Sequence, residues 1–145
     1  MKSLIFIAAL VAATPALAQI KVEDAWSRAT PPGAKIAAGY LIIRNGGPTP
    51  DRLLSASSPA AERVTTHITV QEGGISRMRE VKGYEIPASG TFEAKPGGAH
   101  LMFENIKAPF KEGAMIPATL RFAKAGEMKV EFRVAPLTGE MHHGH

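Results

Sequence analysis

Cysteine is absent from this 145-residue sequence. Thiol–disulfide exchange, a blue-copper centre and a thiolate-bridged binuclear copper centre all require a cysteine sulfur, so these functions are excluded. Disulfide cross-links are excluded as well. A stable domain must therefore depend on burial and backbone pairing, with bound metal as a further contribution.

Long hydrophobic runs and clusters of like charge are missing too. The longest apolar run, residues 4–13, is about half of the ~20 residues that a membrane-spanning helix needs. The formal net charge is +4, and the lysines and arginines are scattered along the chain. We therefore expect no membrane span after processing and no nucleic-acid partner.

The N-terminus has the three parts of a secretory signal peptide. Lys2 supplies the positive start, residues 4–13 the apolar stretch, and Ala16-Leu17-Ala18 a small-x-small cleavage site. We expect residues 1–18 to be removed after Ala18, with an uncleaved tether as the alternative. The remaining length suits a single domain, which we place at residues 19–136, followed by a flexible tail at 137–145.

The rest of the chain consists of short apolar-alternating runs separated by glycine and proline, and no long segment has a helical period. This pattern predicts an all-β sandwich or barrel. Nine strands are predicted, at residues 20–28, 36–45, 51–57, 63–71, 75–81, 91–94, 100–104, 118–123 and 127–135.

Four residues form the spacing His-x10-Met-x21-His-x-Met: His67, Met78, His100 and Met102. Imidazole and thioether together favour monovalent copper, because the neutral, soft sulfur of methionine is a poor ligand for zinc, magnesium or calcium. Taken singly, a strand methionine is more often a core residue and an exposed histidine a surface residue. The spacing alone leaves both interpretations open.

Strand alternation places these residues more closely. Residues two apart on a strand share a face, so His100 and Met102 point one way while Leu101 and Phe103 point towards the core. The same alternation puts His67 on the solvent side of its strand. A hairpin at Gly73-Gly74 would then bring Met78 near the strand that carries His67.

The C-terminal residues contain a second group of candidate ligands, Met141, His142, His143 and His145. Histidines clustered in a flexible segment bind Cu(II) well, which predicts a possible second copper site in the tail. An incidental solvated tail is the alternative.

The four-residue spacing resembles the signature of the periplasmic copper chaperone A (PCuAC) family, and it matches at all four positions. The similarity extends over residues 21–134 and includes Asp24-Ala25-Trp26-Ser27-Arg28 and Lys95-Pro96-Gly97-Gly98-Ala99-His100-Leu101-Met102. This resemblance implies a periplasmic protein with a cupredoxin-like Greek-key β-sandwich or barrel. It also implies one Cu(I) held by His67, Met78, His100 and Met102, and delivery to the copper A centre of cytochrome c oxidase.

A copper metallochaperone is thus the predicted function, with an oxidase subunit or a Sco-type copper protein as its recipient. Copper storage, resistance or uptake through the same site is the alternative. We expect no enzyme, because no acid or base stands out beside the donors; Glu104, on their strand face, is interpreted as a surface residue or a neighbour of a ligand. A monomer is expected, with a metal-bridged dimer as the alternative.

Overall fold

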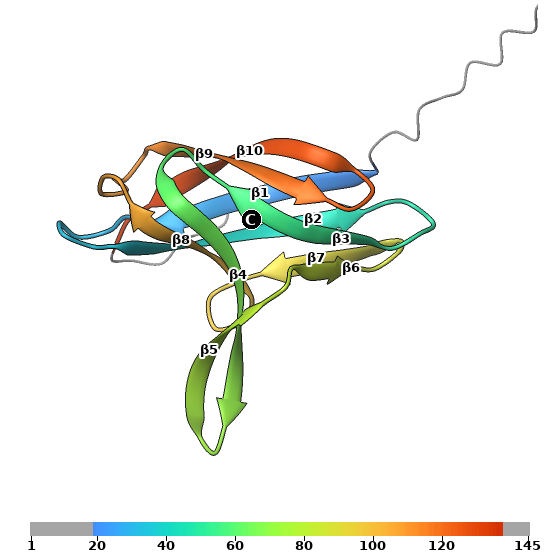
Figure 1. Cartoon of the computed structure of the whole chain (residues 1–145), viewed down its shortest axis with the longest axis horizontal. Coiled ribbons are helices and arrows are strands. Elements are labelled where there is room, and N and C mark those ends of the chain that lie inside the picture. The colour runs from blue at the N-terminus through green and yellow to red at the C-terminus, as the bar shows by residue number, and fades with distance from the viewer. Residues whose placement is uncertain (1–18, 138–145) are drawn as a thin grey trace, which may run out of the picture.

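The computed structural model describes residues 19–137 and contains ten strands (Figure 1). They are β1 (Ile20–Arg28), β2 (Ile36–Asn45), β3 (Asp51–Ser57), β4 (Ala61–Glu72), β5 (Ile75–Val81), β6 (Tyr84–Ile86), β7 (Gly90–Ala94), β8 (His100–Ile106), β9 (Met115–Phe122) and β10 (Gly126–Ala135). No helix occurs in these described residues, so none there could span a membrane.

Seven of the strands close into a barrel. The order β4-β8-β2-β1-β10-β9-β3 is completed by a pairing of β3 with β4. Strand β5 extends the sheet beyond β4, β6 pairs with β3, and β7 pairs with β2. All pairs are antiparallel except β1 with β10. The predicted all-β barrel architecture is confirmed.

Phenylalanines fill the barrel. Phe103 of β8 meets Phe110 and Phe132 edge to face, with ring centroids 5.3 Å and 5.4 Å away. Gly39 of β2 allows this approach, because a Cβ there would lie 2.8 Å from the Phe103 ring. These contacts fix the inner face of β8, and the opposite face of that strand carries His100 and Met102.

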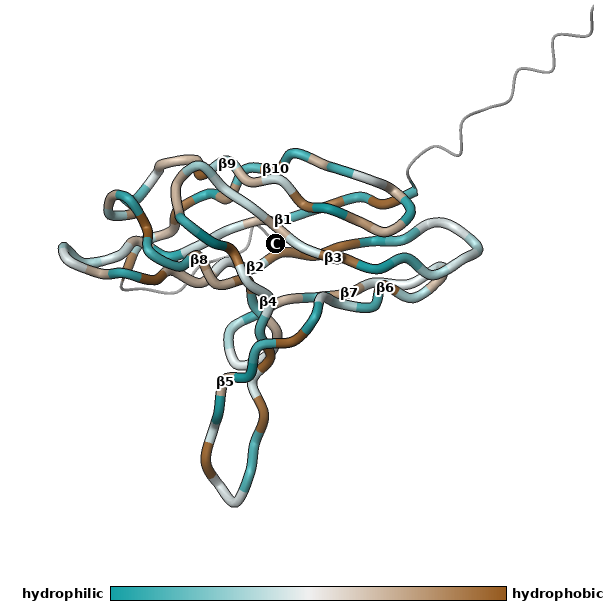
Figure 2. Tube along the Cα trace, in the orientation of Figure 1, coloured by the Kyte–Doolittle hydropathy of each residue, from teal (hydrophilic) through white to brown (hydrophobic). Residues whose placement is uncertain are grey.

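The β4–β5 hairpin projects from the barrel (Figure 1). Its turn residues Gly73 and Gly74 both have positive φ, of 57° and 82°, as a two-residue type I′ turn requires. Figure 2 shows hydrophobic and hydrophilic residues interspersed along both arms, and residues 75–80 of β5 are all exposed. The hairpin is therefore anchored mainly at its base, where β4 also pairs with β8.

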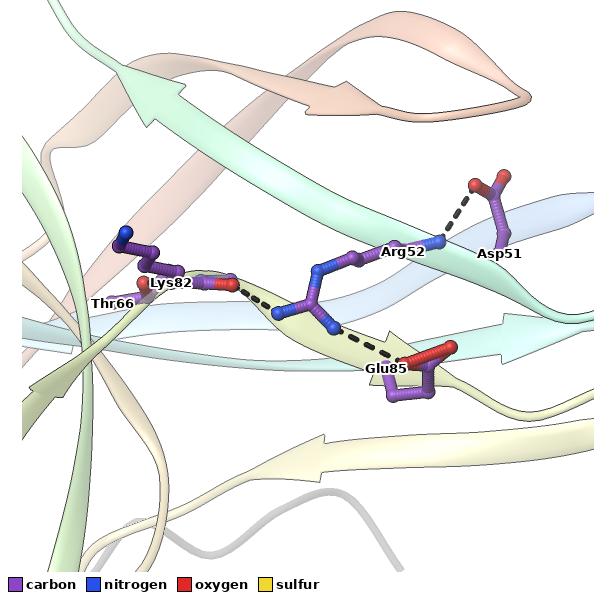
Figure 3. Close-up of polar contacts among 6 residues, drawn as sticks. Asp51, Arg52, Thr66, Lys82 and Glu85 are labelled. Carbon is purple, nitrogen blue, oxygen red and sulfur yellow. Dashed lines mark hydrogen bonds and ion pairs between the residues drawn. The ribbon is translucent and has the colours of Figure 1, made fainter.

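The chain returns from the hairpin through a segment held by polar contacts. Arg52 bonds the carbonyl of Lys82 and pairs with Glu85 at 3.1 Å (Figure 3). The Thr66 hydroxyl accepts the N–H of Gly83 at 3.1 Å and donates to the Val81 carbonyl at 2.6 Å. These contacts fix the segment that precedes β6, whose first residue is Tyr84.

Strand β6 was missed from the sequence because a three-residue strand shows too little alternation to detect. Its entry depends on Gly83, which has φ +76° and no room for a Cβ against the Leu53 carbonyl oxygen. Strands β4 and β8 are also longer than predicted.

Candidate metal centre

Three adjacent strands place the four predicted ligands on one face of the sheet. His67 of β4 lies directly opposite His100 of β8, and Thr65 lies opposite Met102. On the other side of β4, Met78 of β5 lies opposite Thr69, which makes it a diagonal neighbour of His67. The two imidazole rings stack with centroids 5.4 Å apart and an interplanar angle of 17°.

Burial differs sharply among the four side chains. His100 is 3% exposed and Met102 6%, whereas Met78 is 65% exposed. Met102 is buried yet lies outside the main hydrophobic core cluster. Strand β8 is thus covered on both faces over residues 100–103.

The solvent-side prediction for His67 needs correction. Its side chain is half-buried, and its Nδ1 atom is buried completely. The alternation of β4 predicted the correct face, but that face is covered where β4 meets β8. The prediction treated a strand face away from the core as exposed to water, but His100 and Met102 on the same face are buried as well.

Each histidine has one buried ring nitrogen that makes no hydrogen bond: Nδ1 of His67 and Nε2 of His100. The other nitrogen of each ring is engaged. Nε2 of His67 lies 2.8 Å from the Thr65 hydroxyl, and Nδ1 of His100 lies 3.3 Å from the Gly98 carbonyl oxygen. A buried polar atom without a partner costs about 1–3 kcal/mol. A metal ion bound to these two nitrogens would supply the missing partner.

The surroundings of His100 favour the uncharged ring. Burial lowers the pKa of His100 below its ordinary value, and the nearby His67 lowers it further, while the bond to Gly98 acts in the opposite direction. A neutral imidazole keeps a lone pair, which metal binding requires.

A chain of polar contacts runs outward from His67. The Thr65 hydroxyl donates to the Glu104 carboxylate at 2.9 Å, and Arg63 pairs with the same carboxylate oxygen at 3.0 Å. The hydrogen bond from Thr65 is the main cause of a lowered Glu104 pKa, and the contacts with Arg63 lower it further. The sequence placed Glu104 on the correct face, but only the strand pairing showed its link to His67 through Thr65.

Tyr84 lies behind the histidine pair. Its hydroxyl accepts the backbone N–H of His67 at 2.9 Å and lies 2.6 Å from the carbonyl oxygens of both His67 and His100. Burial raises the pKa of Tyr84 to about 12, although these backbone hydrogen bonds act to lower it. No sequence signal pointed to this residue, because the contact joins β6 to two distant strands.

Among residues 19–137, no three histidine, aspartate or glutamate side chains come together as a metal site. Any metal bound by His67 and His100 would need other donors. The thioethers of Met78 and Met102 share their face, and the Glu104 carboxylate on that face is already bonded by Thr65 and Arg63. The tail ligands predicted from the sequence, Met141, His142, His143 and His145, lie outside the described residues.

The model of a protein family described as putative lipoprotein LpqE-like matches residues 20–134. The chain belongs to the LpqE-like family. It is also 34% identical over 121 residues to the putative lipoprotein Lxx21020 of Leifsonia xyli subsp. xyli, covering 83% of this chain and 72% of that protein.

Solved structures extend the comparison for this LpqE-like chain. The copper-bound PCuAC domain from PmoF2 is 28% identical with a TM-score of 0.72, over 83% of this chain and 96% of that domain. The Cu(I) form of DR1885 from Deinococcus radiodurans is 30% identical with a TM-score of 0.66, over 88% of this chain and 85% of that protein. These matches confirm the predicted resemblance to the PCuAC family and the predicted fold.

Proposed function

We propose that this LpqE-like protein is a periplasmic metallochaperone that binds Cu(I) through His67, Met78, His100 and Met102. The observation that carries the proposal is the pair of unpartnered, buried ring nitrogens on facing histidines. Thioethers on the same face complete a donor set that favours Cu(I). Two similar solved structures are named for bound copper, one of them for Cu(I).

The donor set suits a carrier. Imidazole and thioether are neutral, so they leave the charge of the metal uncompensated and hold Cu(I) less firmly than thiolates would. Transfer to a recipient with cysteine thiolates is then downhill. We propose the copper A site of cytochrome c oxidase, reached directly or through a Sco-type protein, as the destination. The proposal assigns no catalytic step to the chain.

The difference in burial suggests which ligand is exchanged first when copper is transferred. Met78 is the exposed donor, on the projecting hairpin, whereas His100 and Met102 are buried. A recipient thiolate can therefore replace Met78 first and take over the metal by ligand exchange. Export fits this role: we propose that residues 1–18 are a cleaved signal peptide and that residues 19–136 form the copper-binding domain.

The binding proposal is tested with residues 19–145, loaded with Cu(I) under anaerobic conditions. Competition with a chromophoric Cu(I) chelator gives the affinity, and X-ray absorption gives the sulfur-to-nitrogen ratio of the bound metal. We expect one tight Cu(I) with both nitrogen and sulfur ligands. A shell of nitrogen alone, or wild-type affinity in Met102→Leu, would contradict the assignment.

The destination needs a separate test in cells. Deleting the gene should lower cytochrome oxidase activity at limiting copper, and the wild-type gene should restore it. A variant with both Met78→Leu and Met102→Leu should not. Unchanged oxidase activity with altered survival at high copper would instead favour storage or resistance.

A further inference from the structure

The contacts of Thr65 determine where the proton of the His67 ring lies. Thr65 Oγ1 is 2.9 Å from a Glu104 carboxylate oxygen and 2.8 Å from His67 Nε2. A carboxylate only accepts hydrogen bonds, and a threonine hydroxyl has a single proton. The Thr65 proton is therefore directed to Glu104, and the hydroxyl oxygen must accept a proton from His67 Nε2.

The other histidine is fixed in the opposite way. Nδ1 of His100 faces the Gly98 carbonyl oxygen at 3.3 Å. Because a carbonyl cannot donate, that nitrogen carries the proton and Nε2 keeps the lone pair. These contacts leave a lone pair on Nδ1 of His67 and on Nε2 of His100. The same two nitrogens are the ones that are buried without a hydrogen-bond partner.

We propose that Thr65 and Glu104 are positioning residues that hold His67 in its Nε2-protonated form, so that Nδ1 is the atom that binds Cu(I). The inference rests on the proposed copper function and makes the site asymmetric, with Nδ1 from one histidine and Nε2 from the other. Thr65 also fixes the ring orientation. Glu104 strengthens the hydrogen bond from Nε2 through Thr65 and makes Nδ1 a better donor.

Arg63 supports the arrangement from outside. It pairs with the same Glu104 oxygen, at 3.0 Å, that accepts the Thr65 proton. This contact keeps the carboxylate over β4, where Arg63, Thr65 and His67 follow one another on a single face. Four groups on two strands are thus linked by hydrogen bonds: His67 donates to Thr65, and both Thr65 and Arg63 donate to the Glu104 carboxylate.

The first readout is the tautomer of His67 in the metal-free protein, from long-range ¹H–¹⁵N NMR of the imidazole. Wild type should show His67 as Nε2–H only, with a slowly exchanging proton. Thr65→Val keeps the shape but removes the hydroxyl, so the slowly exchanging proton should disappear. Thr65→Ser should restore it.

Two further variants separate the hydrogen-bond chain from general effects. Glu104→Ala leaves the Thr65 proton free to bond Nε2, so an Nδ1–H population should appear in the metal-free protein. Thr69→Val is the matched control, because Thr69 lies two residues from His67 on the same face of β4, away from Glu104. It should keep the wild-type tautomer.

The second readout is Cu(I) binding, which NMR can follow because Cu(I) is diamagnetic. Cu(I) should shift Nδ1 of His67 and Nε2 of His100. The affinity of Thr65→Val and Glu104→Ala should fall about tenfold or more, as is typical when the partner of a ligating histidine is removed. Thr65→Ser and Thr69→Val should bind Cu(I) with close to wild-type affinity.

The outcomes distinguish this inference from the proposed function. Two results on the wild-type protein overturn the positioning role alone. They are Cu(I) bound through Nε2 of His67, and an Nδ1–H tautomer in the metal-free form. Failure of the wild-type protein to bind Cu(I), with the Nε2–H tautomer present, overturns the proposed function and with it the copper part of this inference.

Discussion

Met78 and Met102, the two methionines of the proposed copper site, lie in opposite surroundings. Met102 is almost fully buried on β8, whereas Met78 is 65% exposed on the β4–β5 hairpin. This difference fits the proposed carrier role, in which copper must be held on one side and remain accessible for transfer on the other. The two residues should therefore respond differently to the same substitution.

We predict that Met78→Leu weakens Cu(I) binding without changing folding stability. The side chain is exposed, and surface substitutions usually change the free energy of unfolding by less than about 0.5 kcal/mol. Met102→Leu should weaken Cu(I) binding too and cost up to about 1.5 kcal/mol of stability, as expected for a volume-conserving swap in a packed site.

Both variants are measured by chelator competition and by urea unfolding of the metal-free protein. Met115→Leu is a suitable control, because Met115 is also exposed, on β9, and is not among the proposed ligands. If Met78→Leu binds Cu(I) as tightly as Met115→Leu, Met78 is not a ligand and the site has three donors from the chain.

At the scale of elements, β6 supports the two strands that carry the histidines. The Tyr84 hydroxyl contacts the backbone of His67 on β4 and of His100 on β8. It joins them where β4 turns from β8 towards the hairpin. The Tyr84 ring stacks on Phe92 of β7, with ring centroids 4.4 Å apart, and this packing fixes the position of the hydroxyl.

We predict that Tyr84→Phe loosens the base of the hairpin. The substitution removes the acceptor of the His67 N–H and the single hydroxyl proton that the His67 and His100 carbonyl groups share, which should cost about 1–3 kcal/mol. Hydrogen exchange at the His67 amide should become faster, because its acceptor is lost. Tyr40→Phe is the control, since Tyr40 is the other tyrosine and packs against Trp26 rather than the histidines. Unchanged exchange at His67 in Tyr84→Phe would contradict the anchoring role.

Local alternation predicted the strands well but not their partners. The bounds of β1, β2, β3 and β5 agree with the sequence pattern, because each has several alternating residues between clear turn signals. The Gly73-Gly74 turn predicted the pairing of β4 with β5, but no pattern showed that β8 pairs with the other edge of β4, since pairing of distant strands leaves no local signature. Alternation also could not show that the outer face of β8 is covered.

For the whole molecule, the strand order brings the residues of the predicted copper site onto adjacent strands. The His67 strand and the His100 strand are separated in sequence by the hairpin and by β6 and β7, yet they are neighbours in the sheet. The roles of Thr65, Glu104 and Tyr84 required this three-dimensional order. Ordinary polar residues give no sequence signal until their hydrogen-bond partners are known.

The C-terminal segment provides a test that is independent of the barrel. We predict that a protein ending at Thr138 binds less Cu(II) than the full chain, because Met141, His142, His143 and His145 are lost. Its Cu(I) affinity should stay unchanged if the barrel site is separate. Titration of both proteins with each oxidation state decides this, and equal Cu(II) stoichiometry would argue against a tail site.

Folding stability at high pH should report the environment of the two tyrosines, Tyr40 and Tyr84. Burial raises the pKa of Tyr40, although Arg28 opposes the shift, and burial raises the pKa of Tyr84 to about 12. In the unfolded chain both ionise near pH 10, so unfolding releases protons above that pH. The stabilisation from keeping these phenols neutral is complete below about pH 10 and is lost as the pH rises towards 12.

Urea unfolding of metal-free protein between pH 8 and 12, values chosen to span these two pKa values, should show this decline. The decline should be shallower in Tyr84→Phe than in wild type, because the variant lacks the Tyr84 phenol. The lysines that also ionise in this pH range are common to both proteins and do not affect the comparison. Phenolate absorbance provides the direct check: a folded wild-type protein in which both tyrosines ionise near pH 10 would contradict the buried position of the Tyr84 hydroxyl.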